Sequence, residues 1–185
     1  DSPWFIAVVE AGAVVGAAMR TPPHNVLLSE MPAAAAVALC EAITEELPGV
    51  LGPAAIAAGF AQQRGGGTLA MNERIFAIER VTPPRPAPGL WRLADPGDLD
   101  LLAEWLDAFR IEANVTGHDE PRATAERWLT GIGKTVYFWE DAGHVVAMAA
   151  VGGETPRGIR VGPVYTPPAL RGRGYASNVV AAATT

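Results

Sequence analysis

The clearest chemical signal in the sequence lies near its end, where arginine and glycine alternate at Arg171, Gly172, Arg173 and Gly174. Glycine lets the backbone approach a ligand without a Cβ in the way. The Ala/Val-rich run that follows predicts a helix, whose first turn would offer unpaired N–H groups and a positive dipole end to an anion. The two arginines add permanent positive charge beside these donors. The pattern therefore predicts a site that binds phosphate.

A short apolar strand at 161–166 and two prolines, Pro167 and Pro168, surround the entry to this loop. Strand, glycine-rich turn and helix follow one another in the order that a phosphate cradle needs. Basic residues gather here although the whole chain carries a net charge of −6. The loop lacks the Gly-Lys-Ser/Thr ending of a P-loop and the spacing of the three-glycine dinucleotide fingerprint. The alternative is a glycine turn that only changes the direction of the chain.

At these positions the sequence resembles the GNAT superfamily of acyl-coenzyme A-dependent N-acyltransferases. The phosphate loop of that family follows the pattern Gln/Arg-x-x-Gly-x-Gly/Ala, which Arg171, Gly174 and Ala176 match. The resemblance implies that backbone amides from 172 to 177 bind the pyrophosphate of coenzyme A, and that the strand at 164–166 pairs with its pantetheine arm. The cofactor-binding residues implied in this way are Val164, Tyr165, Thr166, Arg171, Gly172, Arg173, Gly174, Tyr175, Ala176 and Ser177.

The composition argues against several other classes of protein. A net charge of −6 and a pI near 5.0 argue against a nucleic-acid partner, because such proteins present a basic face. No apolar run approaches the length that spans a bilayer, so we expect no membrane partner. Cys40 is the only cysteine, and no His/Cys cluster predicts a metal site. The chain begins without methionine or a signal peptide, which we interpret as a cytoplasmic protein whose recorded sequence starts inside a longer one.

The first 81 residues predict a small domain that mixes strands and helices. Two apolar runs around Glu10-Ala11-Gly12 are typical of a β-hairpin, and alanine-rich runs indicate helices. The expected elements are a hairpin of 4–9 and 13–19, a strand at 26–28, a helix at 33–46, a strand at 50–51, a helix at 53–63 and a strand at 69–81.

Four prolines within 82–88 predict an extended, semi-rigid spacer. We therefore expect a first domain over 1–81, a linker over 82–88 and a second domain over 89–185. The elements expected in the second domain are a strand at 90–93, a helix at 96–112 with Asp95 as its N-cap, a helix at 121–130, a hairpin of 135–139 and 145–151, and a strand at 159–166.

The two halves contain an imperfect internal repeat. Residues 10–18 align without gaps with residues 141–149, and a Thr-Pro-Pro triplet follows in both halves, at Thr21 and at Thr166. In the first half the triplet comes before the short strand, and in the second half it comes after the strand. We interpret the chain as an α/β protein with mixed sheets, made of two tandem GNAT-like domains of which the first is degenerate.

The turn of the first half that would correspond to the phosphate loop is Ser29-Glu30-Met31-Pro32, which contains neither glycine nor arginine. An acidic, glycine-free turn is poorly suited to hold a pyrophosphate. Our hypothesis is that the first half supports the fold or shapes the acceptor cleft, while only the second half binds coenzyme A.

The resemblance implies an N-acetyltransferase that moves an acetyl group from acetyl-coenzyme A to a primary amine in a ternary complex. The amine-bearing acceptor would be a small molecule or a peptide, and a homodimer is left open. One alternative is an enzyme similar to mycothiol synthase, which acetylates the amine of a small-molecule thiol precursor. Another is a non-catalytic acyl-coenzyme A sensor or scaffold.

The sequence does not single out a catalytic residue. A thioester is already activated, so the enzyme has to align a neutral amine and stabilise the developing oxyanion, which a backbone N–H near Val164 could do. Gly162-Pro163 predicts either a bulge that opens room for a ligand or a plain sheet edge. The tyrosine that family members use as an acid would lie beyond Thr185. The titratable candidates for the general base are Glu112, His118, Asp119, Glu120, His144 and Glu154.

Overall fold

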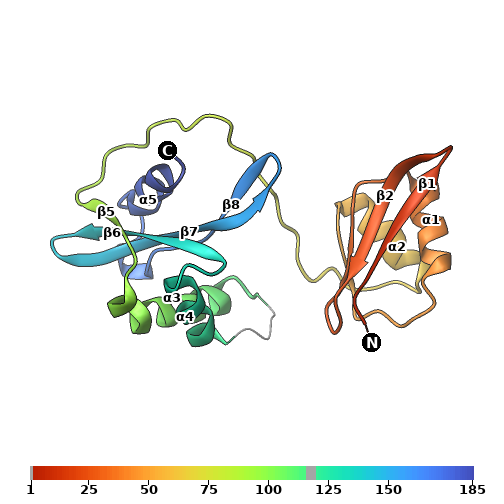
Figure 1. The fold of residues 1–185 in the computed structure, drawn as a ribbon, viewed down its shortest axis with the longest axis horizontal. Coiled ribbons are helices and arrows are strands. Elements are labelled where there is room, and N and C mark those ends of the chain that lie inside the picture. The colour runs from red at the N-terminus through yellow and green to blue at the C-terminus, as the bar shows by residue number, and fades with distance from the viewer. Residues whose placement is uncertain (1, 116–119) are drawn as a thin grey trace. The chain divides into compact units, whose positions relative to one another are not determined.

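The structure, a computed structural model, describes residues 2–115 and 120–185. It divides into two compact units, Asp1–Phe76 and Ala77–Thr185. Each unit combines a four-stranded sheet with helices (Figure 1), which confirms the expected α/β class. The proline-rich stretch 82–88 belongs to the second unit.

The first unit packs two helices against one face of its sheet (Figure 1). Its strands lie in the order β1-β2-β3-β4, with β4 parallel to β3 and the other neighbours antiparallel. The two parallel strands are joined through α1, because parallel neighbours need a crossover connection. The elements are β1 (Trp4–Glu10), β2 (Ala13–Arg20), β3 (Val26–Leu28), α1 (Ala33–Ala42), β4 (Val50–Leu51) and α2 (Ala54–Gln63).

The core of the first unit lies between the two helices and the sheet. Leu39 of α1 and Phe60 of α2 are almost fully buried there. Successive side chains along a strand point to opposite faces of the sheet. The strand residues that do not face α1 and α2 therefore point to the other face of the sheet. No described element of this unit covers that face. An exposed apolar row crosses it in register, from Phe5 through Met19 and Leu27 to Leu51.

Two predictions for the first half of the chain are wrong. The helix expected over 33–46 ends at Ala42, because Ile43 is extended and the Arg64 guanidinium binds the carbonyls that follow the helix. The strand expected over 69–81 does not form. Its large apolar side chains from Leu69 to Ile78 are exposed, Ile75 by 98%, and no described strand lies beside them to complete a ladder. A β-like composition without a pairing partner does not make a strand.

The second unit is an antiparallel sheet with helices on both faces (Figure 1). The strand order is β5-β6-β7-β8, so β8 is an edge strand. Helices α3 and α4 pack on one face, and α5 packs on the other. The elements are β5 (Leu90–Leu93), a 3₁₀ turn (Pro96–Asp98), α3 (Leu99–Glu112), α4 (Pro121–Leu129), β6 (Lys134–Asp141), β7 (His144–Thr155), β8 (Gly158–Tyr165), a second 3₁₀ turn (Pro168–Leu170) and α5 (Tyr175–Ala183).

Strand β7 forms the middle of the second unit and is buried on both faces. Met148 belongs to the core under α3 and α4, whereas Ala147 and Ala149 belong to the core under α5. The small alanine side chains let α5 approach the sheet closely, and Val179 of α5 is fully buried against it. The near-continuous apolar run at 145–151 reflects this two-sided burial.

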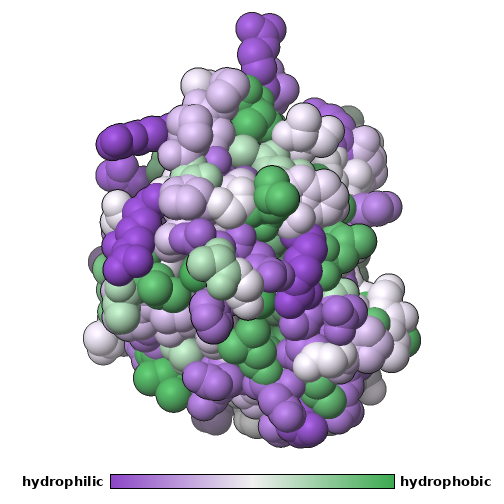
Figure 2. Space-filling model, turned by 90° about the vertical axis from the view of Figure 1, so that its left-hand side faces the viewer, coloured by the Kyte–Doolittle hydropathy of each residue, from purple (hydrophilic) through white to green (hydrophobic). Residues whose placement is uncertain are grey.

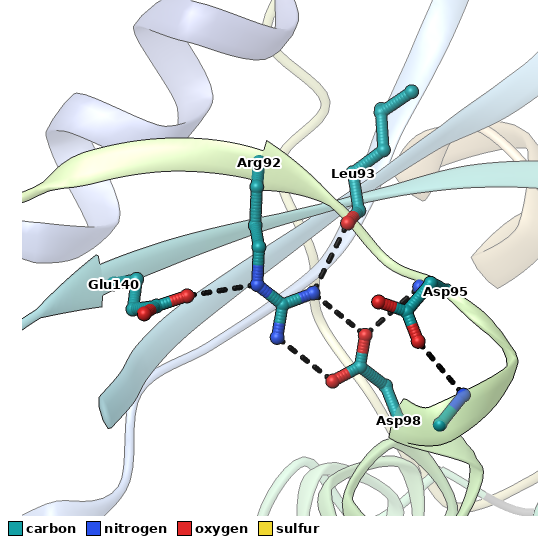
Figure 3. Close-up of polar contacts among 6 residues, drawn as sticks. Arg92, Leu93, Asp95, Asp98 and Glu140 are labelled. Atoms are coloured by element: carbon teal, nitrogen blue, oxygen red, sulfur yellow. Dashed lines mark hydrogen bonds and ion pairs between the residues drawn. The ribbon is translucent and has the colours of Figure 1, made fainter. Parts of the chain in front are cut away.

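An ion-pair network fixes the start of α3 against the sheet (Figure 3). Arg92 on β5 donates to Asp98 in two hydrogen bonds of 2.7 and 2.8 Å, and to Glu140 on β6 in one of 2.8 Å. Asp95 is the N-cap that the Asp-Pro pair predicts, and it forms a capping box with Asp98, each accepting a backbone N–H at 2.8 Å. The Arg92 guanidinium also holds the pKa of the Asp98 carboxyl below its ordinary value. The network thus joins β5, β6 and α3.

The proline-rich stretch packs against the rest of the second unit rather than extending into solvent. The carbonyl of Pro88 accepts from Trp139 Nε1 at 2.7 Å, and the carbonyl of Arg85 accepts from Asn178 Nδ2 at 2.9 Å. A Cβ at Gly89 would collide with a carbonyl of β6, so only glycine fits there. These contacts hold the stretch against β6 and α5.

The hairpins β1–β2 and β6–β7 share the same turn and the same bulge, as the repeat predicts. Both residues of the turn at 11–12 have positive φ, 48° and 81°, and those at 142–143 have 50° and 79°, which is typical of a type I′ turn. The pairing register shifts directly after Val8 in the first hairpin and directly after Trp139, the aligned residue, in the second. The alignment therefore extends to the backbone of the hairpins, while a tandem origin of the units stays a proposal.

On the face shown in Figure 2, hydrophobic residues lie in small groups among hydrophilic ones, which is ordinary for protein surface. Among the described residues, no helix has both the length and the apolar composition that crossing a membrane requires.

Candidate functional site

A pocket of the second unit brings together the end of β8, the loop after it and the first turn of α5. Its volume is about 440 Å³, which lies in the usual range for small-molecule sites. All of the residues predicted to bind the cofactor lie on its wall, together with Leu170. The lining residues are Val164, Tyr165, Thr166, Leu170, Arg171, Gly172, Arg173, Gly174, Tyr175, Ala176 and Ser177.

The two loop glycines are required by backbone conformation. Gly172 has φ 77° and Gly174 has φ 86°, in the left-handed region that disfavours residues with a Cβ. A Cβ on Gly172 would meet open space, and one on Gly174 would make only ordinary contacts. Space alone would therefore admit other residues at both positions. The glycines are needed because the chain turns sharply between β8 and α5.

Helix α5 begins at the pocket with its first turn uncapped by side chains. Gly174 is its N-cap residue, no side chain caps the turn, and no acidic residue lies in it. Asn178 instead braces the turn, because its Nδ2 donates to the carbonyls of Gly174 and Arg85, both at 2.9 Å. The N–H groups of Tyr175, Ala176 and Ser177 thus begin a helix whose positive dipole end faces the pocket.

Arg171 is tightly held by protein groups. Its Nε donates to the carbonyl of Thr166 at 2.8 Å, and its Nη2 donates to Glu112 Oε2 at 2.5 Å. The guanidinium also lies over the ring of Tyr165, 5.7 Å from the centroid. Tyr165 in turn donates its hydroxyl to Glu112 Oε1 at 3.0 Å. The Arg171 guanidinium, with help from this hydroxyl, holds the pKa of the Glu112 carboxyl below its ordinary value.

Arg173, the second loop cation, is exposed and makes fewer contacts with protein groups than Arg171. Its Nη2 makes a long hydrogen bond of 3.4 Å to the carbonyl of Ala169, and no described carboxylate pairs with it in an ion pair. The neighbouring Tyr175 is buried and donates its hydroxyl to Asp141 Oδ2 at 2.6 Å. This hydrogen bond raises the pKa of Tyr175. Tyr175 therefore anchors α5 to the end of β6.

Thr166 carries the one unsatisfied polar atom found among the described buried side chains. The residue is 9% exposed, and its Oγ1 has no hydrogen-bond partner. A buried hydroxyl without a partner is costly. Because Thr166 lies on the pocket wall, a ligand in the pocket could supply that partner.

The pairing of β7 with β8 is interrupted at Gly162-Pro163, where the register shifts between Ala149 and Val151. The predicted bulge is thus confirmed, and β8 is also an edge strand. The Lys134 side chain crosses from β6 and donates to the carbonyl of Gly162. Its Nζ lies 5.3 Å from the centroid of the Trp128 ring, and burial lowers the pKa of the amine.

The candidate bases are spread over the unit. Glu112 lies beside the pocket but accepts from both Arg171 and Tyr165. Glu120 caps α4 by accepting from the N–H of Ala123 at 2.7 Å. His144 and Glu154 are exposed on β7 and do not line the pocket. His118 and Asp119 lie outside the described residues.

Sequence reasoning missed several residues that shape the site. Lys134 and Asp141 reach the pocket region through contacts between residues distant in the chain, and Asn178 contacts both the distant Arg85 and the nearby Gly174. Only Asn178 had a local signal, because it lies one helical turn after Gly174. Among the described residues, no group of three His, Cys, Asp or Glu side chains is placed to hold a metal ion.

Comparisons with known proteins give partial likenesses. No family model matches the chain, and no curated protein matches it. One similar solved structure is a predicted acetyltransferase with acetyl-CoA from Clostridium acetobutylicum, 20% identical over 49% of this chain and 68% of that chain, with a TM-score of 0.40. A possible acetyltransferase from Clostridium difficile 630 is 17% identical over 51% and 68%, with a TM-score of 0.45.

The aminoglycoside N-acetyltransferase AAC(6')-Iy in complex with CoA is also similar. It is 15% identical over 56% of this chain and 71% of that chain, with a TM-score of 0.42. These likenesses are partial, so the chemistry of this chain rests on its own residues.

Proposed function

We propose that this protein is an N-acetyltransferase that moves the acetyl group of acetyl-coenzyme A to a primary amine of a small molecule or peptide. The observation that carries the proposal is the pocket at the β8–α5 junction. A strand end, a loop with two left-handed glycines and an uncapped helix start converge there on one cavity. Such a junction is suited to a diphosphate with an extended arm attached.

The pocket lining combines polar groups with apolar side chains. Backbone N–H groups from Gly174 to Ser177 and the exposed Arg173 suit the pyrophosphate, because each places positive charge or a donor near its oxygens. Val164 and Leu170 add apolar side chains to the lining, which suit the pantetheine arm. The unpartnered hydroxyl of Thr166 adds a polar group to the lining.

The reaction needs little covalent help from the protein. The amine nitrogen attacks the thioester carbonyl, a C–N bond forms, the C–S bond breaks, and the thiolate leaves while the nitrogen loses a proton. The protein has to hold amine and thioester in line and donate to the developing oxyanion. The interrupted pairing beside Val164 supports a role for β8 backbone N–H groups in that donation.

We assign no general base. Glu112 is poorly placed for that role, because both of its carboxylate oxygens accept hydrogen bonds and its pKa lies below the ordinary value. A base has to take up a proton near neutral pH, which this environment disfavours.

Turnover of acetyl-coenzyme A is the experiment that tests the function. Release of free coenzyme A thiol in the presence of a panel of primary amines, including amine precursors of small-molecule thiols, is the expected result. Tight binding without release with any amine would favour an acyl-coenzyme A sensor or scaffold instead.

The pocket itself is tested by Gly174→Glu. A side chain forced into a left-handed position, with a carboxylate beside the phosphates, should weaken coenzyme A binding by at least about 100-fold. Gly131→Glu is the matched control, because Gly131 likewise has a left-handed φ, 80°, and no steric conflict for a Cβ, but lies away from the pocket. Unchanged affinity in Gly174→Glu would reject the site.

A further inference from the structure

We propose that Glu112 and Arg171 are a positioning pair that braces the phosphate loop, and that Arg173 with the backbone N–H groups meets the phosphates. This assignment rests on the proposed coenzyme A site. It changes the role expected for Arg171, whose charge the sequence places directly beside the ligand. Glu112 then acts on the ligand only through Arg171.

The geometry around Arg171 closes a ring of contacts. The guanidinium reaches the carbonyl at the end of β8 with Nε and the carboxylate at the end of α3 with Nη2. The second carboxylate oxygen accepts from the Tyr165 hydroxyl, and the Tyr165 ring lies under the guanidinium. Arg171 therefore ties together α3, β8 and the loop, three segments that meet at one edge of the pocket.

The charges of the Glu112 carboxylate and the Arg171 guanidinium cancel. Glu112 and Arg171 are 2.5 Å apart and roughly half-exposed, so an approaching phosphate meets a neutral pair. Arg173 has no described carboxylate in an ion pair with it and is exposed at the same pocket. The net positive charge of the loop therefore comes from Arg173 and the start of α5.

Packing supports a bracing role. Tyr165 is 7% exposed and packs against Trp105 of α3, with ring centroids 5.7 Å apart. One side of the brace is therefore anchored in the core under α3 and α4. The loop it holds contains Gly172 and Gly174, and glycine loses more conformational freedom on folding than any other residue, so contacts that hold the loop matter most there.

Coenzyme A binding by Arg171→Gln, Glu112→Gln, the double variant of both, and Arg173→Gln, each at two salt concentrations, tests the assignment. Arg171→Gln should weaken binding about tenfold, because it frees the loop and leaves Glu112 uncompensated beside an anion. The double variant with Glu112→Gln should recover most of that loss, since the uncompensated carboxylate is gone and two amides can still bond. Arg173→Gln should weaken binding and also reduce its salt dependence, because it removes a charge that salt screens.

A second measurement needs no ligand, and so separates this proposal from the function. Glu112→Gln should speed hydrogen exchange of the amides at 171–174 in the free protein. Arg110→Gln is the matched control, because the Arg110–Asp107 pair on α3 is similarly exposed but away from the pocket.

Three results would overturn the positioning role. One is a reduced salt dependence in Arg171→Gln without recovery in the double variant, which would make Arg171 a phosphate ligand. Another is tighter binding in Glu112→Gln, which would make Glu112 a competitor of the phosphates. The third is unchanged loop exchange in Glu112→Gln. If the unaltered protein does not bind coenzyme A, the proposed function is rejected instead. The hydrogen-exchange experiment then still tests whether Glu112 and Arg171 brace the loop.

Discussion

Strands β3 and β8 each follow an equivalent hairpin and each lead to a helix, but the chain crosses to α1 through 29–32 and to α5 through 166–174. The hairpins before them agree in turn conformation and in the position of the bulge. One difference between the two units thus lies directly after the strand that follows each hairpin. The shared scaffold alone does not create a ligand site.

The short turn of the first unit is filled by its own side chains. Ser29 Oγ accepts from the N–H of Ala17 at 2.9 Å, which closes the turn onto β2. Met31 is buried over Gly16, where even a Cβ would collide with it. The backbone of the longer loop in the second unit instead lines a cavity. Loop length and left-handed glycines therefore separate a packed turn from a candidate phosphate site.

The units also differ in what covers the sheet. Phe5 of the first hairpin is 69% exposed, whereas the aligned Val136 is 4% exposed beneath α3 and α4. Those helices supply Glu112, which contacts the loop from outside the hairpin repeat. The site of the second unit thus depends on elements that have no counterpart in the described first unit.

Exchanging the turns is expected to have the largest effect. Replacement of 166–174 with the sequence Ser-Glu-Met-Pro should abolish measurable coenzyme A binding, a loss of at least about 100-fold. The hairpin β6–β7 should remain, because its turn and bulge do not involve the loop. Calorimetry measures the binding, and circular dichroism checks the fold. Retained binding would show that the loop is not what distinguishes the two units.

The two structural arginines provide a second comparison, in stability. Arg20 of the first unit is 6% exposed and pairs with Glu45 at 2.6 Å, whereas Arg92 of the second is 34% exposed and pairs with Asp98. Arg20→Met should destabilise the first unit by about 3 kcal/mol, and Arg92→Met should destabilise the second by about 2 kcal/mol. Urea unfolding followed separately for each unit measures both. Equal costs would show that burial of the pair does not set its contribution.

The smallest effect is expected at the two hairpin turns. Gly12→Ala and Gly143→Ala should each cost about 1 kcal/mol, because both glycines have positive φ and open space around the Cβ position. The same unfolding experiment compares them. Costs that differ by more than the experimental error would show that the hairpins are alike in geometry but not in energetics.

Local patterns predicted much of the fold. The hairpins, the strand before the loop and the helix after Asp95-Pro96 follow from alternation, turn residues and capping, which depend on neighbours in sequence. The failed strand over 69–81 shows the limit of this reasoning, because a strand needs a partner that composition does not provide.

Part of the site could also be predicted from residues that are neighbours in the sequence. The loop is contiguous, so its glycines and arginines could be read directly, and its residues do line one pocket. The partner of Arg171 is Glu112, which lies 59 residues away. Lys134, the only lysine in the chain, reaches Gly162 from another strand. Such pairings arise from the packing of α3, β6 and β8, and the sequence around each residue contains no signal for them.

Calorimetric titration of the chain with coenzyme A tests the central claim most directly. We predict one site per chain, and loss of that site in Gly174→Glu. Two equivalent sites per chain, or one site that survives Gly174→Glu, would contradict the assignment of the pocket to the second unit alone.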